Sequence, residues 1–509
     1  MSEFLASKSI SENVINLNYM KSENEIGRIQ PMTSSLFMLF SRDISDPYKW
    51  QGFHFSKNIW IEIFLIQLIQ SDDMGMTRTV STNFGEPLTT ESKKLVDEVR
   101  LKINQAIHPN FDNDFNIYRF VLACERALKK KKDIVNTAAK ALNNHLRIRK
   151  AFNLDDLPDL PPPENPIYSL RMFPMGNILN ETDNYNKLLW YVEYKTINVE
   201  AIAHVLRSSE SIRLQFRHFE HLLRRVNQQE KKTGRLSGIK HIIDMNGYEI
   251  NPFIMILTTN GNLAYLSRLL HFDNYPELIN PVEMVNSPKW IHVAYKIART
   301  MMPESFVERF RLYNENFLSD LLKEIKIEDI PTNLGGKNEE IHCQPAAYEQ
   351  YAKLESLESP GNLETIIISP GKRRLIYVDV KEKGNRLQWY FTTDGDINFG
   401  VFYEPPYQIL SSNESNDMRQ EQDINIDELE MVYPWFKLAA KLVSEADSIE
   451  CTRPGRYWIV ICNKLSWIRR KTVNLVIQLV YKDNDYAKRY YSDGTFNKCS
   501  KPFVINYLL

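Results

Sequence analysis

Apolar residues recur at steps of three and four positions along three stretches between residues 88 and 157, and this spacing places them on one face of a helix. The three stripes are Leu95, Val99, Ile103 and Ile107, then Ile117, Phe120, Val121, Cys124 and Leu128, then Ile134, Val135, Ala138, Leu142 and Leu146. Three successive short helices predict a small helical domain. The proline-rich stretch at 157–163 is stiff and should end that domain.

Strand-like and helix-like segments alternate between residues 163 and 337. Strands are predicted at 187–194 and 238–244, and a long helix at 199–227 lies between them. Alternation of this kind predicts an open, largely parallel sheet with helices packed against it.

A helix with one apolar face is predicted at 289–302. Ser287 can cap its unpaired amides, and Pro288 suits the first helical position, where the missing N–H costs nothing. Its apolar face consists of Trp290, Val293, Ala294, Ile297 and Met301. An apolar segment at 278–285 precedes this helix, and a strand near 309–313, a second helix and a stop at Gly335-Gly336 follow it. Periodicity alone is typical of a helix that covers an ordinary core.

The apolar period changes to two after a polar linker at 338–363. Leu387, Trp389 and Phe391 alternate with polar neighbours, and so do Ile397, Phe399 and Val401. The turn at Asp394-Gly395-Asp396 lies between these stripes, and together they predict a β-hairpin. Further strands at 457–462 and 473–480 predict an antiparallel sandwich over 364–482. Residues 1–87 carry no assignable motif, and 483–509 are expected to form a tail.

Composition limits the class of protein. A chain of 509 residues is too long for one core, and 43% hydrophobic with 25% charged residues is typical of soluble domains. The chain has 63 Lys and Arg residues and 64 Asp and Glu residues, and the resulting net charge of -1 does not favour a nucleic-acid partner. Five scattered cysteines without C-x-x-C spacing predict a reducing compartment. No signal peptide or membrane-spanning segment is recognised, so a cytoplasmic protein is expected.

Sequence signatures of enzymes are absent. The chain has no G-x-S-x-G, G-x-G-x-x-G, G-x-x-x-x-G-K-[ST] or H-E-x-x-H motif, and its ten histidines form no metal-spaced cluster. His218 and His221 share a predicted helix with Arg217 and Arg224, which favours a solvated face. We therefore expect no catalytic residues, no metal and no cofactor other than a bound ligand.

Four short sequence motifs, called words below, occur in order between residues 274 and 337. They are Tyr275-Pro276-Glu277, Asn286-Ser287-Pro288 with its helix, Ile330-Pro331, and Leu334-Gly335-Gly336-Lys337. This order resembles the end of the CRAL-TRIO lipid-transfer domain, the family of phosphatidylinositol transfer proteins and the α-tocopherol transfer protein. Residues 114–126 are similar to the N-terminal signature of that family, and 231–234 and 244–248 are similar to words around its central strand.

The C-terminal sequence carries a second resemblance. The stretch from Leu387 to Val401, followed by Cys451, 454–457, Asn463, Ser466 and Lys471, resembles the GOLD domain, which often follows a CRAL-TRIO domain. The two resemblances imply a multidomain protein with three parts. These are a small N-terminal helical domain at 88–157, an α/β CRAL-TRIO lipid-binding domain at 163–337, and an all-β GOLD sandwich.

The CRAL-TRIO resemblance implies a dry pocket beneath a movable gate helix, here 289–302. Burying a methylene gains about 0.8 kcal/mol, so a fifteen-carbon chain gains on the order of 10 kcal/mol in such a pocket. The apolar face of the gate helix would line it.

Headgroup selection in the family depends on two further positions. In members that bind inositides, the Glu of the first word and a Lys one strand later are linked to the headgroup, and the matching residues here are Glu277 and Arg309. Arg309 keeps the charge and can hold phosphate by two bonds, or it can be a solvated partner of Glu304 or Glu308.

A strand position bears on the other ligand classes. Members that bind phosphatidylcholine carry small hydroxyl residues where this chain has Ile239 and His241, which disfavours that lipid. A sterol-like or tocopherol-like ligand would tolerate Ile239, and His241 would offer it one hydrogen bond. His241 can equally be a satisfied core histidine.

Membrane contact is the remaining expectation. The run Lys129, Lys130, Lys131 and Lys132 is either a solvated corner or a contact with anionic lipid. We therefore expect a lipid-binding or lipid-transfer protein that visits membranes transiently as a peripheral protein. The alternative is a membrane-trafficking adaptor with a vestigial pocket, in which the GOLD domain binds protein or membrane through 372–374 and 469–471.

Overall fold

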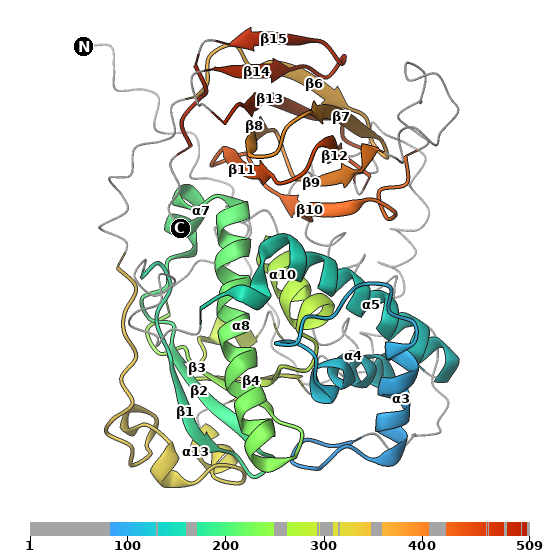
Figure 1. The fold of residues 1–509 in the computed structure, drawn as a ribbon. Coiled ribbons are helices and arrows are strands. Elements are labelled where there is room, and N and C mark those ends of the chain that lie inside the picture. Colours follow the sequence, from blue (N-terminus) through green and yellow to red (C-terminus); the bar gives the residue numbers. More distant parts are fainter. Residues whose placement is uncertain are drawn as a thin grey trace, which may run out of the picture. The chain divides into compact units, whose positions relative to one another are not determined.

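The structure is a computed structural model that describes residues 82–128, 131–158, 171–248, 262–292, 295, 309–313, 316–347, 359–406, 424–464, 466, 468–482, 486–499 and 501–505 (Figure 1). Within these ranges, no helix has both the length and the hydropathy needed to cross a lipid bilayer.

The first described region is helical, as the apolar stripes predict. It contains α3 (Thr90–Arg100), α4 (Asp114–Ala127), α5 (Lys131–Phe152) and a 3-10 turn, η2 (Leu154–Asp156). The side chain of Thr89 accepts a hydrogen bond from the amide of Ser92, and this cap begins α3. Asn113 caps α4 in the same way. The first and third helices differ from prediction, because α3 ends before Ile103 and Ile107, and α5 is 22 residues long.

A five-stranded sheet forms the centre of the second region. Its strands are β1 (Asn177–Thr182), β2 (Lys187–Glu193), β3 (Gly238–Asp244), β4 (Ile279–Val285) and β5 (Phe310–Leu312), in that spatial order. Only the β1–β2 pair is antiparallel. The prediction of an open, largely parallel sheet is therefore confirmed.

Helices and tight turns accompany this sheet. They are α7 (Val199–Val205), α8 (Ser208–Thr233), α10 (Asn262–Arg268), the π-helical turn η4 (Leu269–Asn274), α13 (Phe317–Leu321), and the 3-10 turns η5 (Ile327–Asp329) and η6 (Thr332–Leu334). The single long helix predicted at 199–227 is wrong. Arg207 has an extended backbone that separates α7 from α8, and its amide donates a hydrogen bond to the Glu210 carboxylate, which begins α8.

The two faces of β3 belong to different hydrophobic cores. Ile239 and Ile243 pack in one core with residues of α4, α5 and α8. Ile242 points the other way and packs with Leu321 and Leu334. Because side chains alternate along a strand, these two faces follow directly from the β3 sequence.

The C-terminal region consists of antiparallel strands in two sheets. The strands are β6 (Glu364–Ile368), β7 (Arg373–Val380), β8 (Asn385–Thr393), β9 (Ile397–Glu404), β10 (Glu430–Leu438), β11 (Glu445–Cys451), β12 (Gly455–Cys462), β13 (Lys471–Val480), β14 (Ala487–Tyr490) and β15 (Phe496–Cys499). One sheet has the order β10-β9-β12-β7. The other has the order β11-β8-β13-β14-β15, with β6 also paired to β13.

The hairpin predicted around Asp394-Gly395-Asp396 is not formed. Strand β8 pairs with β11 and β13, whereas β9 pairs with β10 and β12. The turn therefore carries the chain from one sheet to the other, and the Trp389 and Phe399 rings, 5.2 Å apart, meet between the sheets. Alternating apolar residues indicate which side of a strand is buried, but they do not indicate its pairing partner.

The tail expected at 483–509 also differs from prediction. Strand β14 pairs with β13, and β15 pairs with β14, so this segment extends the larger sheet.

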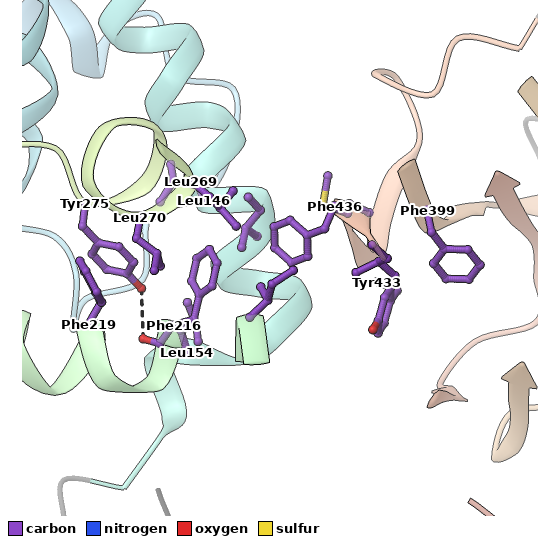
Figure 2. Packing of buried hydrophobic residues seen from close by; sticks show 14 of the residues in the cluster. Leu146, Leu154, Phe216, Phe219, Leu269, Leu270, Tyr275, Phe399, Tyr433 and Phe436 are labelled. Carbon is purple, nitrogen blue, oxygen red and sulfur yellow. Dashed lines mark hydrogen bonds between the residues drawn. The ribbon is translucent and has the colours of Figure 1, made fainter. Parts of the chain in front are cut away.

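Aromatic side chains form a continuous packed cluster in the second region. Figure 2 shows Phe216 and Phe219 of α8 beside Tyr275, which precedes β4. The Phe216 ring also lies 5.7 Å from the ring of Phe436 in β10. Tyr275 donates a hydrogen bond of 2.7 Å to the Glu220 carboxylate, so the buried hydroxyl is satisfied.

Candidate functional site

Glu277 lies at the entry to β4 and is only 2% exposed. Its backbone has a positive φ of 58°, which turns the chain from Tyr275 into the strand. The carboxylate forms ion pairs with Arg309 and with Arg126, the latter at 2.6 Å. The side-chain amide of Asn280 donates a third bond at 2.7 Å. Glu277 thus joins α4, β4 and the residue before β5.

Charge compensation keeps the Glu277 carboxyl ionised. Burial alone would raise its pKa, but the guanidinium groups of Arg309 and Arg126 outweigh burial and lower the pKa below its usual value. The site therefore contains a buried carboxylate held between two cations.

Arg309 is also buried, which rules out the alternative that it is a solvated side chain. Its Nη1 donates to the backbone oxygen of His271 at 3.0 Å, and its guanidinium carbon lies 4.4 Å from the centroid of the Phe272 ring. Glu304 and Glu308, the other suggested partners, lie outside the described residues. Arg309 and Glu277 pair with each other.

Ile239 and His241 lie on one face of β3, and both are buried. The His241 ring stacks on Trp190 of the neighbouring strand β2, with ring centroids 3.6 Å apart and planes within 11°. Trp190 and His241 are direct partners in the parallel register of β2 and β3, so the backbone pairing places the rings together.

Two further histidines approach this face. His218 of α8 lies 5.1 Å from the Trp190 ring. His271 of η4 packs edge-on against Phe219 at 5.2 Å and against Phe310 at 6.0 Å. The His218 contact and the burial of His221 contradict the solvated face that was predicted for this helix.

Burial keeps these imidazoles uncharged. It lowers the pKa of His218 to about 4 and the pKa of His271 to about 3, and in His271 the nearby Arg309 adds to the effect. The pKa of His241 is also lowered by burial, and next by the neighbouring His271 and His218. Each ring therefore carries one hydrogen-bond donor and one acceptor at neutral pH.

The start of the predicted gate helix is described at 289–292 and at Tyr295. Trp290 stacks near Tyr248, with ring centroids 6.2 Å apart. The Ser287 hydroxyl lies 3.4 Å from the sulfur of Met245, so it contacts the turn after β3. Four of the predicted lining residues, Val293, Ala294, Ile297 and Met301, lie outside the described residues.

The turn after β3 is fixed by side-chain hydrogen bonds. The Asp244 carboxylate accepts from the amide of Asn246 at 3.0 Å and from the side chain of Asn286 at 2.9 Å. Because Asn286 immediately precedes Ser287, these bonds tie the entry of the gate helix to the end of β3.

The predicted membrane contact is only partly described. Lys129 and Lys130 lie outside the described residues, and Lys131 and Lys132 begin α5. In the described part of the chain, no group of three or more His, Cys, Asp or Glu residues could hold a metal ion.

Sequence reasoning did not identify Arg126, Trp190 and His271 as members of this site. Arg126 lies 151 residues before Glu277, a separation that no local pattern reveals. Trp190 could have been found by placing the predicted strands β2 and β3 in parallel register, which sets it beside His241.

Three family models match successive parts of the chain. Residues 88–157 match a domain of unknown function, DUF8435, and residues 175–336 match the CRAL/TRIO domain. Residues 350–488 match a model described as F28H7_8_C-like, C-terminal domain. The resemblance of the sandwich to the GOLD domain remains a prediction.

Two nematode proteins are similar over most of their length. The CRAL-TRIO domain-containing protein F28H7.8 of Caenorhabditis elegans is 22% identical over 396 residues, which cover 75% of this chain and 89% of that protein. Protein ctg-1 of Caenorhabditis elegans is 20% identical over 403 residues, which cover 77% and 98%. Among solved structures, the crystal structure of Sfh5 matches with a TM-score of 0.32 and 15% identity, covering 53% of this chain and 87% of that chain. The chain therefore contains a CRAL-TRIO domain at residues 175–336 and has a CRAL-TRIO domain-containing protein among its relatives.

Proposed function

We propose that the protein is a lipid-binding or lipid-transfer protein, and that it acts without catalytic residues. The ligand would lie against the face of the sheet that carries Ile239 and His241, beneath the helix that begins at Lys289. The observation that carries this proposal is the CRAL-TRIO match at 175–336.

The chemistry of that face supports the proposal. Trp190, His241 and Phe310 present aromatic rings or an uncharged imidazole, and the buried Glu277 carboxylate is compensated by Arg309 and Arg126. A face without uncompensated charge favours an apolar ligand, because removing an acyl chain from water gains about 0.8 kcal/mol per methylene.

The gate helix would open at the turn that holds its first residues. Tyr248 and Trp290 are in contact, and Asn286 is tied to Asp244. Movement of the helix about this turn would expose the face to a membrane, and its return would exclude water.

Native mass spectrometry of the purified protein, with extraction and identification of bound lipid, tests the proposal. We expect a co-purified lipid in the wild-type protein and its loss in W290D. The matched control is L101D, because Leu101 follows α3 and is 87% exposed. A wild-type protein that neither retains lipid nor takes it from vesicles would contradict the proposal.

A peripheral membrane adaptor is the second candidate, and an exposed surface on the sandwich favours it. Ile468 is 80% exposed and is followed by Arg469 and Arg470. The side-chain amide of Asn463 donates a hydrogen bond to the backbone oxygen of Arg469, and its backbone N–H donates one to the backbone oxygen of Lys372. The basic segments 372–374 and 469–471 therefore lie together. Exposed apolar and basic residues suit an anionic membrane surface.

Sedimentation with vesicles distinguishes the two candidates. If the protein is an adaptor, we expect the I468D/R470E variant to bind vesicles containing phosphatidylserine less than the wild type does. The wild-type protein should bind vesicles of pure phosphatidylcholine only weakly. A lipid-free wild-type protein that sediments with anionic vesicles would favour the adaptor, whereas a lipid-loaded one supports the carrier.

A further inference from the structure

We propose that His241 and His271 form the polar end of the ligand site and bind an uncharged hydroxyl group of a lipid. This inference rests on the proposed lipid-binding function and narrows its ligand class. It predicts that lipids with a phosphate or carboxylate at this position bind more weakly than those with a hydroxyl group.

The inference begins with two unpartnered nitrogen atoms. Nε2 of His241 and Nδ1 of His271 are buried and have no hydrogen-bond partner among the residues that the structure describes. The His241 side chain belongs to a residue that is 5% exposed, so bulk water is not its partner. Buried polar atoms in folded proteins nearly always have a partner, and an unmatched pair at one site therefore points to a bound group.

The surroundings of these nitrogens are apolar. Trp190 covers one side of the His241 ring, and Phe219 and Phe310 pack against His271. The two imidazoles come from different elements, β3 and η4, and a chain of ring contacts through Trp190, His218 and Phe219 links them. In this proposal, the polar group of a lipid lying along this face contacts both nitrogens.

The charge state of the imidazoles selects the kind of polar group. Because the pKa values of both histidines are lowered, the rings are neutral at pH 7, and each nitrogen is either a donor or an acceptor. A hydroxyl has one donor and two lone pairs, so it can donate to one imidazole and accept from the other. A methyl or methylene group would leave both nitrogens unmatched.

The same site is poorly suited to an anion. Arg309 is the nearby cation, and it is already bound to the Glu277 carboxylate and to the backbone oxygen of His271. A buried phosphate without a dedicated cation would be strongly disfavoured. The Arg309 Nε atom is, however, also buried without a partner in the described residues, and it makes a carboxylate ligand the main competitor.

Binding titrations with paired probes test the inference. The first pair is the fluorescent sterol dehydroergosterol and its 3-deoxy analogue. The second pair is 1-hexadecanol and hexadecane, whose binding is measured by displacement of a fluorescent fatty acyl probe. We expect the wild-type protein to prefer the hydroxyl member of at least one pair by about tenfold, the effect of one well-placed hydrogen bond.

The matched variants are H241F and H271F, because phenylalanine keeps the ring contacts and removes both nitrogens. Each should lose about tenfold in affinity for the hydroxyl member and change little for the hydroxyl-free member. The control is H204F, since His204 is exposed on α7, far along the chain from β3. Unchanged far-ultraviolet circular dichroism and retained affinity for the hydroxyl-free member show that the variants are folded.

Three outcomes overturn the inference itself. Equal affinity within both pairs, preference for oleic acid over both hydroxyl probes, or a stoichiometric metal ion lost in H241F would each do so while leaving lipid binding intact. Failure to bind any of these probes or phospholipid vesicles would instead refute the proposed function on which the inference rests.

Discussion

Arg309 and Glu277 form a buried ion pair across 32 residues of sequence, and the same carboxylate also binds Arg126 of α4. Replacing Arg309 by methionine should destabilise the protein by about 3 kcal/mol, because it leaves a buried carboxylate with one cation fewer. Urea denaturation measures this change. The control is K323A, which removes an exposed pair with Asp320 and should cost less than about 1 kcal/mol.

The double variant E277Q/R309M separates pairing from packing. Removing both charges should recover part of the stability lost in R309M, because no unpaired charge remains buried. A double variant less stable than R309M by the full cost of E277Q would show that the two residues act independently.

Gly336 permits a close approach of two chain segments at the end of the α/β region. A Cβ atom at this position would lie 2.0 Å from the backbone oxygen of Ile330. G336A should therefore destabilise the protein by several kcal/mol, since backbone must move. G361A is the matched control, because a Cβ atom at Gly361 would meet no atom within 4 Å. Thermal unfolding that shifts equally in both variants would contradict this account.

Local sequence patterns predicted the bounds of individual strands better than they predicted which strands pair with each other. The residues of β3 were predicted without error, because glycine turns at Gly234 and Gly247 limit the strand on both sides. The β8–β9 pairing was wrong, since alternation does not encode the partner strand. In the candidate site, resemblance singled out Glu277 and Arg309, but their mutual burial depends on tertiary contacts that no local pattern contains.

His145 should make stability depend on acidity. Its ring is fully buried, Nδ1 lies 3.1 Å from the side-chain oxygen of Asn274, and burial and then Arg149 lower its pKa to about 3. The unfolded chain binds a proton near pH 6.5 and the folded chain does not, so stability is lost as pH falls below that value. At pH 5 this residue should contribute a loss of about 2 kcal/mol.

The variant H145N removes this titrating group. Its unfolding free energy should therefore change less than that of the wild type between pH 7 and pH 5, by about 2 kcal/mol. Parallel pH profiles for the two proteins would show that His145 does not remain neutral in the fold.

Glu445 in β11 should act in the opposite direction. Burial raises its pKa to about 7, although hydrogen bonds from the amide and hydroxyl of Ser209, at 3.1 and 2.5 Å, partly oppose that rise. The folded state therefore holds a proton that the unfolded chain releases near pH 4.5, and stability is lost as pH rises from about 4.5 to 7.

The variant E445Q keeps a similar shape and an acceptor for the Ser209 amide, but it cannot ionise. It should unfold at a higher temperature than the wild type at pH 8, where the wild-type carboxylate is charged and buried, and it should have no advantage at pH 4.5. Differential scanning calorimetry at the two pH values checks this crossover. A variant that is less stable than the wild type by the same amount at both pH values would mean that Glu445 contributes through its hydrogen bonds and not through its proton.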